Sequence, residues 1–443
     1  MREVVRSLFP GLKADLERLV SIPSVSAPGF DPANLRRSAE LVASLFAGAG
    51  LDTRLLEVEG APPAVLATFP APAGAPTVLL YAHHDVQPPG DLALWVSPPF
   101  EPTERGGRLY GRGAGDNKSG IAMHLAAVRA FAGKPPVGLK VFIEGEEETG
   151  SEHLGQFLSR YGDGLAADVC VLADSGNIQA GIPTLTTSLR GLVDCVVEVR
   201  TLDHAVHSGV FGGPFPDALT VLCRLLATLH DEKGTPAVGN RAVAPGPALD
   251  IPEEIIRTLA GVLPGVEAIG EGGITERMWA RPSISVLAID APRVAEASNQ
   301  LVPVARAKVS MRIAPGDDPR LAMDDLAGHL EQHAPWGARV TVTRGSAARP
   351  FAVKAAGPAY EAMKEVMAEA WGCPAIEMGL GGSIPFVAEI AEAFPEATLL
   401  LVGAGDPDTR EHGENESVLL ADLEKACLSE TLLLAKLGEA GVR

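Results

Sequence analysis

The chain has 443 residues, and 56 acidic against 37 basic side chains give it a formal net charge of −19. That length exceeds what one hydrophobic core usually supports, so we expect two domains, and a hydrophobic fraction of 46% argues against a disordered chain. The excess of negative charge disfavours binding to nucleic acid or to anionic membranes.

The N-terminal sequence, the hydropathy of the chain and the cysteine spacing together predict where in the cell the protein resides. The first residues mix charged with apolar side chains and lack a small-residue cleavage site, so no signal peptide is expected. No stretch of about 18 apolar residues is free of charges, Gly or Pro, so no transmembrane helix is expected. The five cysteines form no zinc-binding or redox spacing. We therefore predict a cytoplasmic protein with reduced thiols and no membrane partner.

The first part of the chain alternates between amphipathic helices and short apolar strands. Helices are expected at 12–20, 34–48, 119–131 and 151–161, and strands at 77–82, 139–143 and 169–173. Such alternation is typical of an α/β fold with a central, mostly parallel sheet flanked by helices.

The pattern changes near residue 186 and returns after residue 350. In between, strands are expected at 192–199, 305–314 and 338–343, helices at 216–230 and 318–333, and a stretch rich in Pro and Gly at 234–282. Later elements are a helix at 357–371, a strand at 397–402 and a helix at 418–438. We predict one α/β domain, formed by residues 1–185 and 349–443, that is interrupted by an α+β domain at 186–348.

Chemically reactive side chains cluster where the predicted strands end. In chain order they are His83, His84, Asp85, Asp116, Glu147, Glu148, Asp174 and His412. Because functional residues gather past the carboxyl ends of strands in such sheets, we expect these side chains to converge on one sheet edge. Strand alternation allows only one of His83 and His84 to face that edge, and Asp85 then lies on the same side as His83.

Imidazole and carboxylate groups together suit zinc and similar divalent ions. Even five of these side chains are too many ligands for one tetrahedral ion with an open position. Such a number suits two ions about 3.5–4 Å apart with a bridging carboxylate. Each cluster alone has a simpler explanation: the His-His-Asp run as surface residues, the acidic run at 144–148 as a solvated turn. All of them together, at successive strand ends, predict a metal centre.

These motifs resemble those of the M20 family of dinuclear metallopeptidases, and within it the carnosinase-like (cytosolic nonspecific) dipeptidases. The resemblance covers nearly the whole chain. It is carried by the segments 81–88, 109–118, 147–151, 207–210 and 381–385, together with Asp174 and His412.

The resemblance implies two divalent metal ions per subunit, with zinc favoured and manganese or cobalt possible. The implied ligands are His83, Asp116, Glu148, Asp174 and His412. In this scheme His83 and Asp174 hold one ion, Glu148 and His412 hold the other, and Asp116 bridges the two. A cis peptide bond after the bridging aspartate is also implied.

The implied reaction is hydrolysis of the peptide bond of a dipeptide by a metal-bridging water. Glu147 would act as the general base, and Asp85 would orient His83. Two alternatives remain within the family, an N-acyl-amino-acid deacylase and a carboxypeptidase. A third alternative, of a different class, is a catalytically silent homologue that only binds metal or a peptide.

The family also implies a homodimer whose α+β insert serves as a lid and dimerisation domain, while the α/β part is catalytic. His207 would then act in trans, donating to the oxyanion in the active site of the partner subunit. Arg312 would bind the free carboxylate of the substrate, with Gly382 and Ser383 at the same end. Gln300 matches a polar lid position that touches substrate.

Two departures from the family pattern concern the substrate. Gly379 and Leu380 stand where the relatives carry charged or polar residues, and His84 stands where they carry an apolar one. Both departures leave the side-chain preference for the substrate open, while the chemistry implied by the metal ligands is unaffected.

Overall fold

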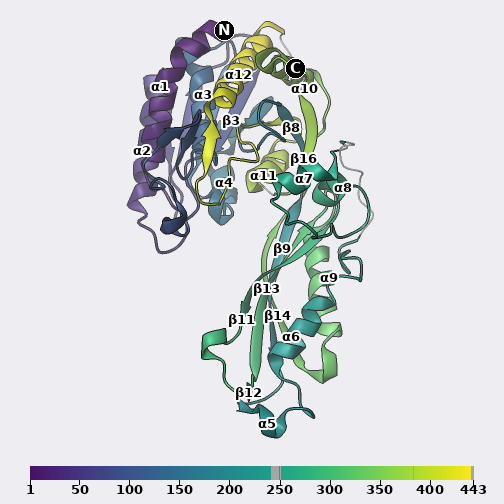
Figure 1. Ribbon diagram of the computed structural model, residues 1–443. Coiled ribbons are helices and arrows are strands. Elements are labelled where there is room, and N and C mark those ends of the chain that lie inside the picture. Colours follow the sequence, from purple (N-terminus) through teal and green to yellow (C-terminus); the bar gives the residue numbers. More distant parts are fainter. Residues whose placement is uncertain (241–248, 250, 383, 441–443) are drawn as a thin grey trace. The chain divides into compact units, whose positions relative to one another are not determined.

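The computed structural model describes residues 1–240, 249, 251–382 and 384–440, and Figure 1 shows their ribbon. The chain divides into two compact units. The first unit contains Met1–Thr187, Val353–Met378 and the chain from Ile384 onward. The second unit contains Ser188–Ala352 and the turn that begins at Gly379. No helix in the described part of the chain is both long enough and apolar enough to cross a membrane.

The largest sheet among the described residues has the strand order β1-β2-β6-β3-β7-β17-β8-β15, with β16 beside β8. Its strands are β1 (Asp52–Leu56), β2 (Ala64–Phe69), β3 (Thr77–His83), β6 (Gly138–Glu144), β7 (Val169–Leu172), β8 (Thr184–Leu189), β15 (Phe351–Ala352), β16 (Ile376–Leu380) and β17 (Thr398–Leu401). The four neighbouring strands β6, β3, β7 and β17 run parallel, and the β1–β2 and β2–β6 pairs are antiparallel. The predicted α/β class with a mostly parallel central sheet is confirmed.

Helices cover this sheet because its central strands are apolar on both faces. The helices of the first unit are α1 (Arg2–Val20), α2 (Ala33–Gly48), α3 (Lys118–Ala130), α4 (Leu154–Leu165), α10 (Pro358–Trp371), α11 (Pro385–Ala393) and α12 (Leu420–Ala440). On one face Leu80 joins the core beneath α1, α3 and α12, which contact one another (Figure 1). On the other face the ring of Tyr81 stacks on Phe386 of α11, with the ring centroids 3.7 Å apart.

The first helix is longer than its sequence pattern predicts. We expected it to start at residue 12, yet α1 begins at Arg2 and contains Pro10. The missing N–H of a proline costs least in the first turns of a helix, but Pro10 lies well beyond them. Val5 is fully buried, and Leu8 and Phe9 pack against the core, so tertiary packing extends the helix past the proline.

A buried ion pair ties three of these elements together. The Nδ1 atom of His124 on α3 lies 2.9 Å from a carboxylate oxygen of Glu430 on α12. Its Nε2 atom lies 2.9 Å from the carbonyl oxygen of Tyr81 on β3. A carbonyl only accepts hydrogen bonds, so Nε2 carries a hydrogen and one further proton is shared between Nδ1 and Glu430. Both side chains are fully buried.

Replacing His124 with Leu is expected to lower the free energy of unfolding by about 3–5 kcal/mol, because it leaves the carboxylate of Glu430 buried without a partner. Urea unfolding of the metal-free protein measures this loss. The double variant His124→Leu/Glu430→Leu is expected to recover most of the loss, since it removes both charges. A double variant no more stable than the single one would contradict this account of the pair.

The second unit has its own sheet and core. A four-stranded antiparallel sheet has the order β11-β13-β9-β14 among the described residues. Its strands are β9 (Gly191–Arg200), β11 (Ser283–Asp290), β13 (Val304–Ile313) and β14 (Arg339–Ala348). The helices α6 (Ala218–Ala227) and α9 (Pro319–Gln332) pack on this sheet, and apolar side chains between them form a separate hydrophobic cluster.

Short elements complete both units. The stretch rich in Pro and Gly contains α7 (Glu253–Leu259) and α8 (Ile274–Trp279), which its composition did not predict. The remaining α-helices and strands of the described residues are α5 (Ser208–Phe211), the paired strands β10 (Val206–His207) and β12 (Gln300–Leu301), and a small sheet of β4 (Thr103–Arg105), β5 (Arg108–Tyr110) and β18 (Ser417–Leu419). The loop between β5 and α3 carries Asp116.

Candidate active site

The end of β3 presents one histidine to a group of aspartates. The Nε2 atom of His83 lies 3.0 Å from Asp116 and 3.6 Å from Asp174, each measured to a carboxylate oxygen. Its Nδ1 atom lies 3.2 Å from a carboxylate oxygen of Asp85. The ring of His84 points away, since its Nε2 donates to the carbonyl of Pro63 at 2.9 Å. The two rings therefore point apart, as strand alternation requires.

Asp116 also belongs to a second group of ligand atoms. The Nε2 atom of His412 lies 3.1 Å from the other carboxylate oxygen of Asp116 and 3.2 Å from Glu148. Two sets of possible metal ligands result, His83 with Asp116 and Asp174, and Asp116 with Glu148 and His412. Within each set the ligand atoms lie within 4.8 Å of one another. Asp116 is the member that the two sets share.

The loop around Asp116 is tied to its neighbours by the next residue. The peptide bond from Asp116 to Asn117 is cis, as the family resemblance implies. The side-chain amide of Asn117 donates to the carbonyl of Ala173 at 2.6 Å and to a carboxylate oxygen of Asp174 at 2.5 Å. Asn117 therefore fixes the position of Asp174 relative to the loop that carries Asp116.

Asp85 connects the histidine to the acidic turn that follows β6. Its carboxylate accepts hydrogen bonds from the backbone N–H groups of Glu147 at 3.2 Å and Glu148 at 3.1 Å. The hydroxyl of Ser26 donates to it at 2.7 Å. Because Asp85 is fully buried and faces His83 as well, it sets the geometry of the imidazole and of the turn together.

The charges of the site perturb one another strongly. Burial, followed by the negative charge of Asp174, raises the pKa of Glu147 well above its usual value. Burial likewise raises the pKa of Glu148 to about 7, with Asp116 as the next cause. Hydrogen bonds to Asp116 and Glu148 raise the pKa of His412 to about 11. These shifts reflect burial together with an excess of close carboxylates, and bound positive charge would relieve the repulsion among those carboxylates.

The donor set fits divalent metal ions. Each set combines one imidazole nitrogen with two carboxylates and has no thiolate, which suits Zn²⁺, Mn²⁺ or Co²⁺. A carboxylate shared between two sets is the arrangement of paired metal ions. The residues present therefore fit two divalent cations.

Glu416 holds the loop that carries Asp116, a role that the sequence did not reveal. Its buried carboxylate accepts hydrogen bonds from the backbone N–H groups of Gly113 at 3.0 Å, Gly115 at 2.9 Å and Asp116 at 2.9 Å. The guanidinium of Arg112, also fully buried, donates to it at 2.5 Å. The one sequence signal was an arginine inside a glycine-rich loop, which does not identify its distant partner.

Replacing Glu416 with Gln is expected to weaken metal binding by about 10- to 100-fold, as is typical for residues that support metal ligands. The amide would turn a donor toward the loop and leave Arg112 without its carboxylate. Competition with a chromophoric chelator measures the affinity. Glu414→Gln, which changes a nearby carboxylate outside this hydrogen-bond set, is the matched control. Equal affinity in Glu416→Gln and wild type would contradict the supporting role.

The other predicted residues belong to the second unit. His207 and Gln300 face each other across the β10–β12 pair. The Nδ1 atom of His207 accepts the N–H of Gly209 at 3.0 Å, which leaves its Nε2 as a hydrogen-bond donor. Arg312 is half-buried on β13, and Gly382 lies in the turn after β16. Ser383 lies outside the described residues. The predicted residues thus form one metal-type cluster in the first unit. In the second unit they are not brought together, because His207 and Gln300 lie beyond the Val304 end of β13, whereas Arg312 lies near its opposite end.

Sequence comparisons identify the family. The profile described as Peptidase family M20/M25/M40 matches residues 79–435. Cysteinylglycine-S-conjugate dipeptidase of Corynebacterium striatum is 36% identical over 372 residues, covering 82% of each chain. Beta-Ala-His dipeptidase of Rattus norvegicus is 28% identical over 383 residues, covering 81% of this chain and 76% of the relative.

Solved structures share the fold. Human carnosine dipeptidase 1 aligns with a TM-score of 0.82 at 24% identity, covering 99% of this chain and 100% of that one. The dipeptidase Dug1p of Saccharomyces cerevisiae aligns with a TM-score of 0.85 at 21% identity, covering 99% and 98%. The expected relation to the M20 family is confirmed, and the chain is an enzyme of peptidase family M20/M25/M40.

Proposed function

We propose that this enzyme is a dinuclear metal-dependent dipeptidase. The observation that carries the proposal is the position of Asp116, which belongs to both ligand sets. The sequence relatives named above are dipeptidases, which supports the same substrate class for this chain. The family alternatives, an N-acyl-amino-acid deacylase and a carboxypeptidase, share the metal chemistry and differ in the substrate.

In this proposal His83 and Asp174 would hold one divalent ion, Glu148 and His412 would hold the other, and Asp116, which belongs to both ligand sets, would serve both ions. Zinc is the favoured ion, and manganese or cobalt would suit the same ligands. A pair of such ions supplies Lewis-acid polarisation of the scissile carbonyl and a water of lowered pKa.

Glu147 is the proposed general base. It accepts a proton from the attacking water and returns that proton to the leaving amine. Its carboxylate belongs to neither ligand set among the described residues, as a base that exchanges protons with water requires. Asp85 acts indirectly, because it positions the imidazole of His83 and the turn that carries Glu147.

The second unit would supply substrate recognition. We propose that residues 186–348 form a lid and dimerisation domain between the catalytic segments 1–185 and 349–443. His207 would donate its Nε2 hydrogen to the oxyanion in the active site of the partner subunit, with Gln300 beside it. Arg312 would bind the free carboxylate of the dipeptide, and Gly382 and Ser383 would bind at the same end.

A homodimer through the second unit is part of this proposal. Strand β11 lies at an edge of its sheet among the described residues and exposes Val286, Leu287 and Ile289. An exposed apolar edge strand is a template for pairing with another chain. We also propose a cytoplasmic location, which five free cysteines support.

A substrate panel tests the proposal. Dipeptides, a tripeptide and N-acetyl amino acids are incubated with the protein in Zn²⁺, Mn²⁺ or Co²⁺. Cleavage of dipeptides ahead of the other substrates is expected. Release of acetate without dipeptide cleavage would establish the deacylase alternative, and preferred release of the C-terminal residue of the tripeptide would establish the carboxypeptidase. Absence of hydrolysis with any metal would point to a catalytically silent homologue.

A further inference from the structure

Arg190, between β8 and β9, has a hydrogen-bonding capacity that none of the described residues uses. Its Nη1 donates to the hydroxyl of Ser283 at 3.0 Å and to the carbonyl of Arg281 at 3.3 Å. Its Nε is buried, and no hydrogen-bond partner for it occurs among the residues that the structure describes. An unpartnered buried donor on a cation is costly, so it marks a place where a ligand would be stabilising.

A second guanidinium lies on the same side of the sheet. Ser283 on β11 stands directly opposite Arg312 on β13. Directly opposite residues of an antiparallel pair share a face, so Arg190, which reaches Ser283, lies on the face of Arg312. Burial, followed by the charge of Arg312, lowers the pKa of Arg190 to about 10.

The two guanidinium groups have no counter-charge among the residues that the structure describes. Burial lowers the pKa of Arg312. Within the described part of the chain, no carboxylate pairs with Arg190 or with Arg312, although the protein has 56 acidic residues. Two half-buried like charges without a carboxylate favour binding of an anion from outside.

The chain at the end of β16 and in the turn after it approaches Arg190. The N–H of Arg190 donates to the carbonyl of Leu380 at 3.2 Å. A Cβ atom at Gly381 would lie 3.0 Å from the Nη2 of Arg190, so a glycine permits the turn to pass this close. Gly381 therefore lies against the side chain of Arg190 within the second unit.

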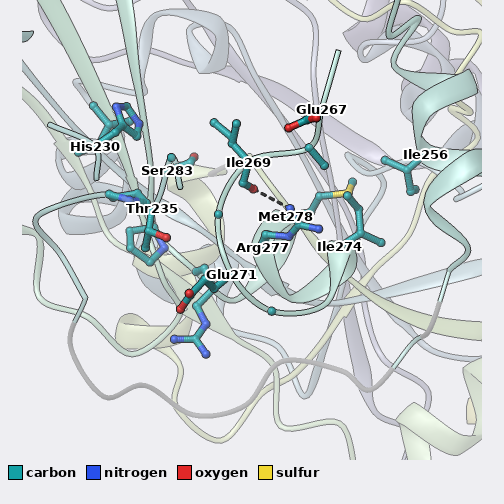
Figure 2. Close-up of a pocket in the computed structure, with 18 of the residues that line it drawn as sticks. His230, Thr235, Ile256, Glu267, Ile269, Glu271, Ile274, Arg277, Met278 and Ser283 are labelled. Atoms are coloured by element: carbon teal, nitrogen blue, oxygen red, sulfur yellow. Dashed lines mark hydrogen bonds between the residues drawn. The ribbon is translucent and has the colours of Figure 1, made fainter. Parts of the chain in front are cut away.

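A cavity of about 990 Å³ in the second unit has Arg190 and Ser283 in its wall. Figure 2 shows Ser283 among the residues that line this cavity. Other cations on the wall are engaged. Arg277 donates to the carbonyl of Ile269 at 2.6 Å, the dashed line in Figure 2. Arg281 pairs with Glu276 at 2.6 Å. Arg190 in contrast lies on this wall with no carboxylate partner among the described residues.

We propose that Arg190 is a second carboxylate-recognising residue, which acts with Arg312 and the turn of Gly381 and Gly382 to bind the free carboxylate of the substrate. The proposal rests on the dipeptidase function proposed above. A guanidinium offers a planar pair of donors that matches a carboxylate, and two of them distinguish a free carboxylate from an amide more sharply than one. Arg190 would thus contribute to the selection of short peptides with a free end.

The test compares Ala-Ala with Ala-alaninamide, which lacks the free carboxylate. Arg190→Gln is expected to raise KM for Ala-Ala by about tenfold or more, with kcat changed by less than about twofold. Its kcat/KM for Ala-alaninamide should stay within about twofold of wild type. Arg190→Lys, which keeps the charge without the planar donors, should fall in between. Arg281→Gln, which removes a neighbouring paired charge, is the matched control.

Equal losses on both substrates would overturn the proposal and indicate a general structural role. Binding of N-acetylalanine and N-acetylalaninamide to the full chain, measured by calorimetry, separates this outcome from failure of the dipeptidase function. If wild type does not cleave Ala-Ala, the dipeptidase proposal fails by itself. A preference of wild type for the acid over the amide that Arg190→Gln abolishes would still support the role of Arg190. Equal acid binding by both proteins would contradict it, and Arg190→Lys serves if the Gln variant does not fold.

Discussion

Glu147→Gln is expected to lower kcat for dipeptide hydrolysis by about 10²- to 10⁴-fold, the contribution typical of a general base. The amide occupies the space of the carboxylate but cannot accept a proton. Because Glu147 is in neither ligand set, the variant should still bind two metal ions. The backbone N–H of residue 147 still reaches Asp85, so the geometry of the turn is retained.

Steady-state kinetics and metal analysis by mass spectrometry on the same preparation measure both quantities. Glu152→Gln changes an exposed carboxylate on the same segment and should behave as wild type. A Glu147→Gln variant that keeps wild-type kcat would show that another group accepts the proton. Loss of metal together with activity would instead place Glu147 among the ligands.

Asp116→Asn should have the largest effect on metal binding. Asp116 supplies one carboxylate oxygen to His83 and the other to His412, and each ligand set needs it. Asparagine has the same shape without the charge, so both metal positions weaken together. Metal affinity should fall by more than the roughly 10- to 100-fold that is typical when a residue that hydrogen-bonds to a metal ligand is replaced. Hydrolysis should fall with metal content.

Isothermal titration calorimetry of the metal-depleted protein with Zn²⁺ measures this loss of metal affinity. Asp408→Asn, at an exposed position in the loop that leads to His412, controls for the removal of one carboxylate. If Asp116→Asn retained one tightly bound ion and lost only the other, Asp116 would belong to a single ligand set. Unchanged binding of two ions would remove it from the metal centre.

Local patterns in the sequence revealed much of the first unit. Apolar runs identified β3, β6, β7 and β17, and the polar residues after them lie together because parallel strands end at one edge. Strand alternation separated His83 from His84, and the structure gives His84 a backbone partner on the opposite side. These features depend on near neighbours in the chain, so periodicity reveals them.

Long-range partners could not be read from the sequence. Arg112 and Glu416 are 304 positions apart, and His124 and Glu430 are 306 positions apart. Each residue alone looks like an ordinary charged side chain, and only the fold shows that the pair is buried. The same holds for Arg190, which donates to Ser283, and for Arg312, which stands opposite Ser283 in the sheet. Only the fold shows that these residues lie on one face.

The fold explains why the chain has a glycine at position 379, where the family pattern has a charged or polar residue. A Cβ atom there would lie 2.5 Å from the Cβ of Trp279, which is 4% exposed on α8. Trp279 therefore occupies the space that a larger residue at position 379 would need. The sequence pattern did not predict α8, so it gave no reason to connect Trp279 with this turn.

Metal stoichiometry measured in parallel with hydrolysis tests the central claim most directly. Protein from which a chelator has removed the metal is titrated with Zn²⁺. The amount of bound metal and the rate of Ala-Ala cleavage are recorded at each step. We expect cleavage to be absent without metal and to reach its maximum as about two ions per chain bind, as two ligand sets that share Asp116 require. Full dipeptide cleavage by the metal-free protein, or saturation at one ion per chain, would contradict the account.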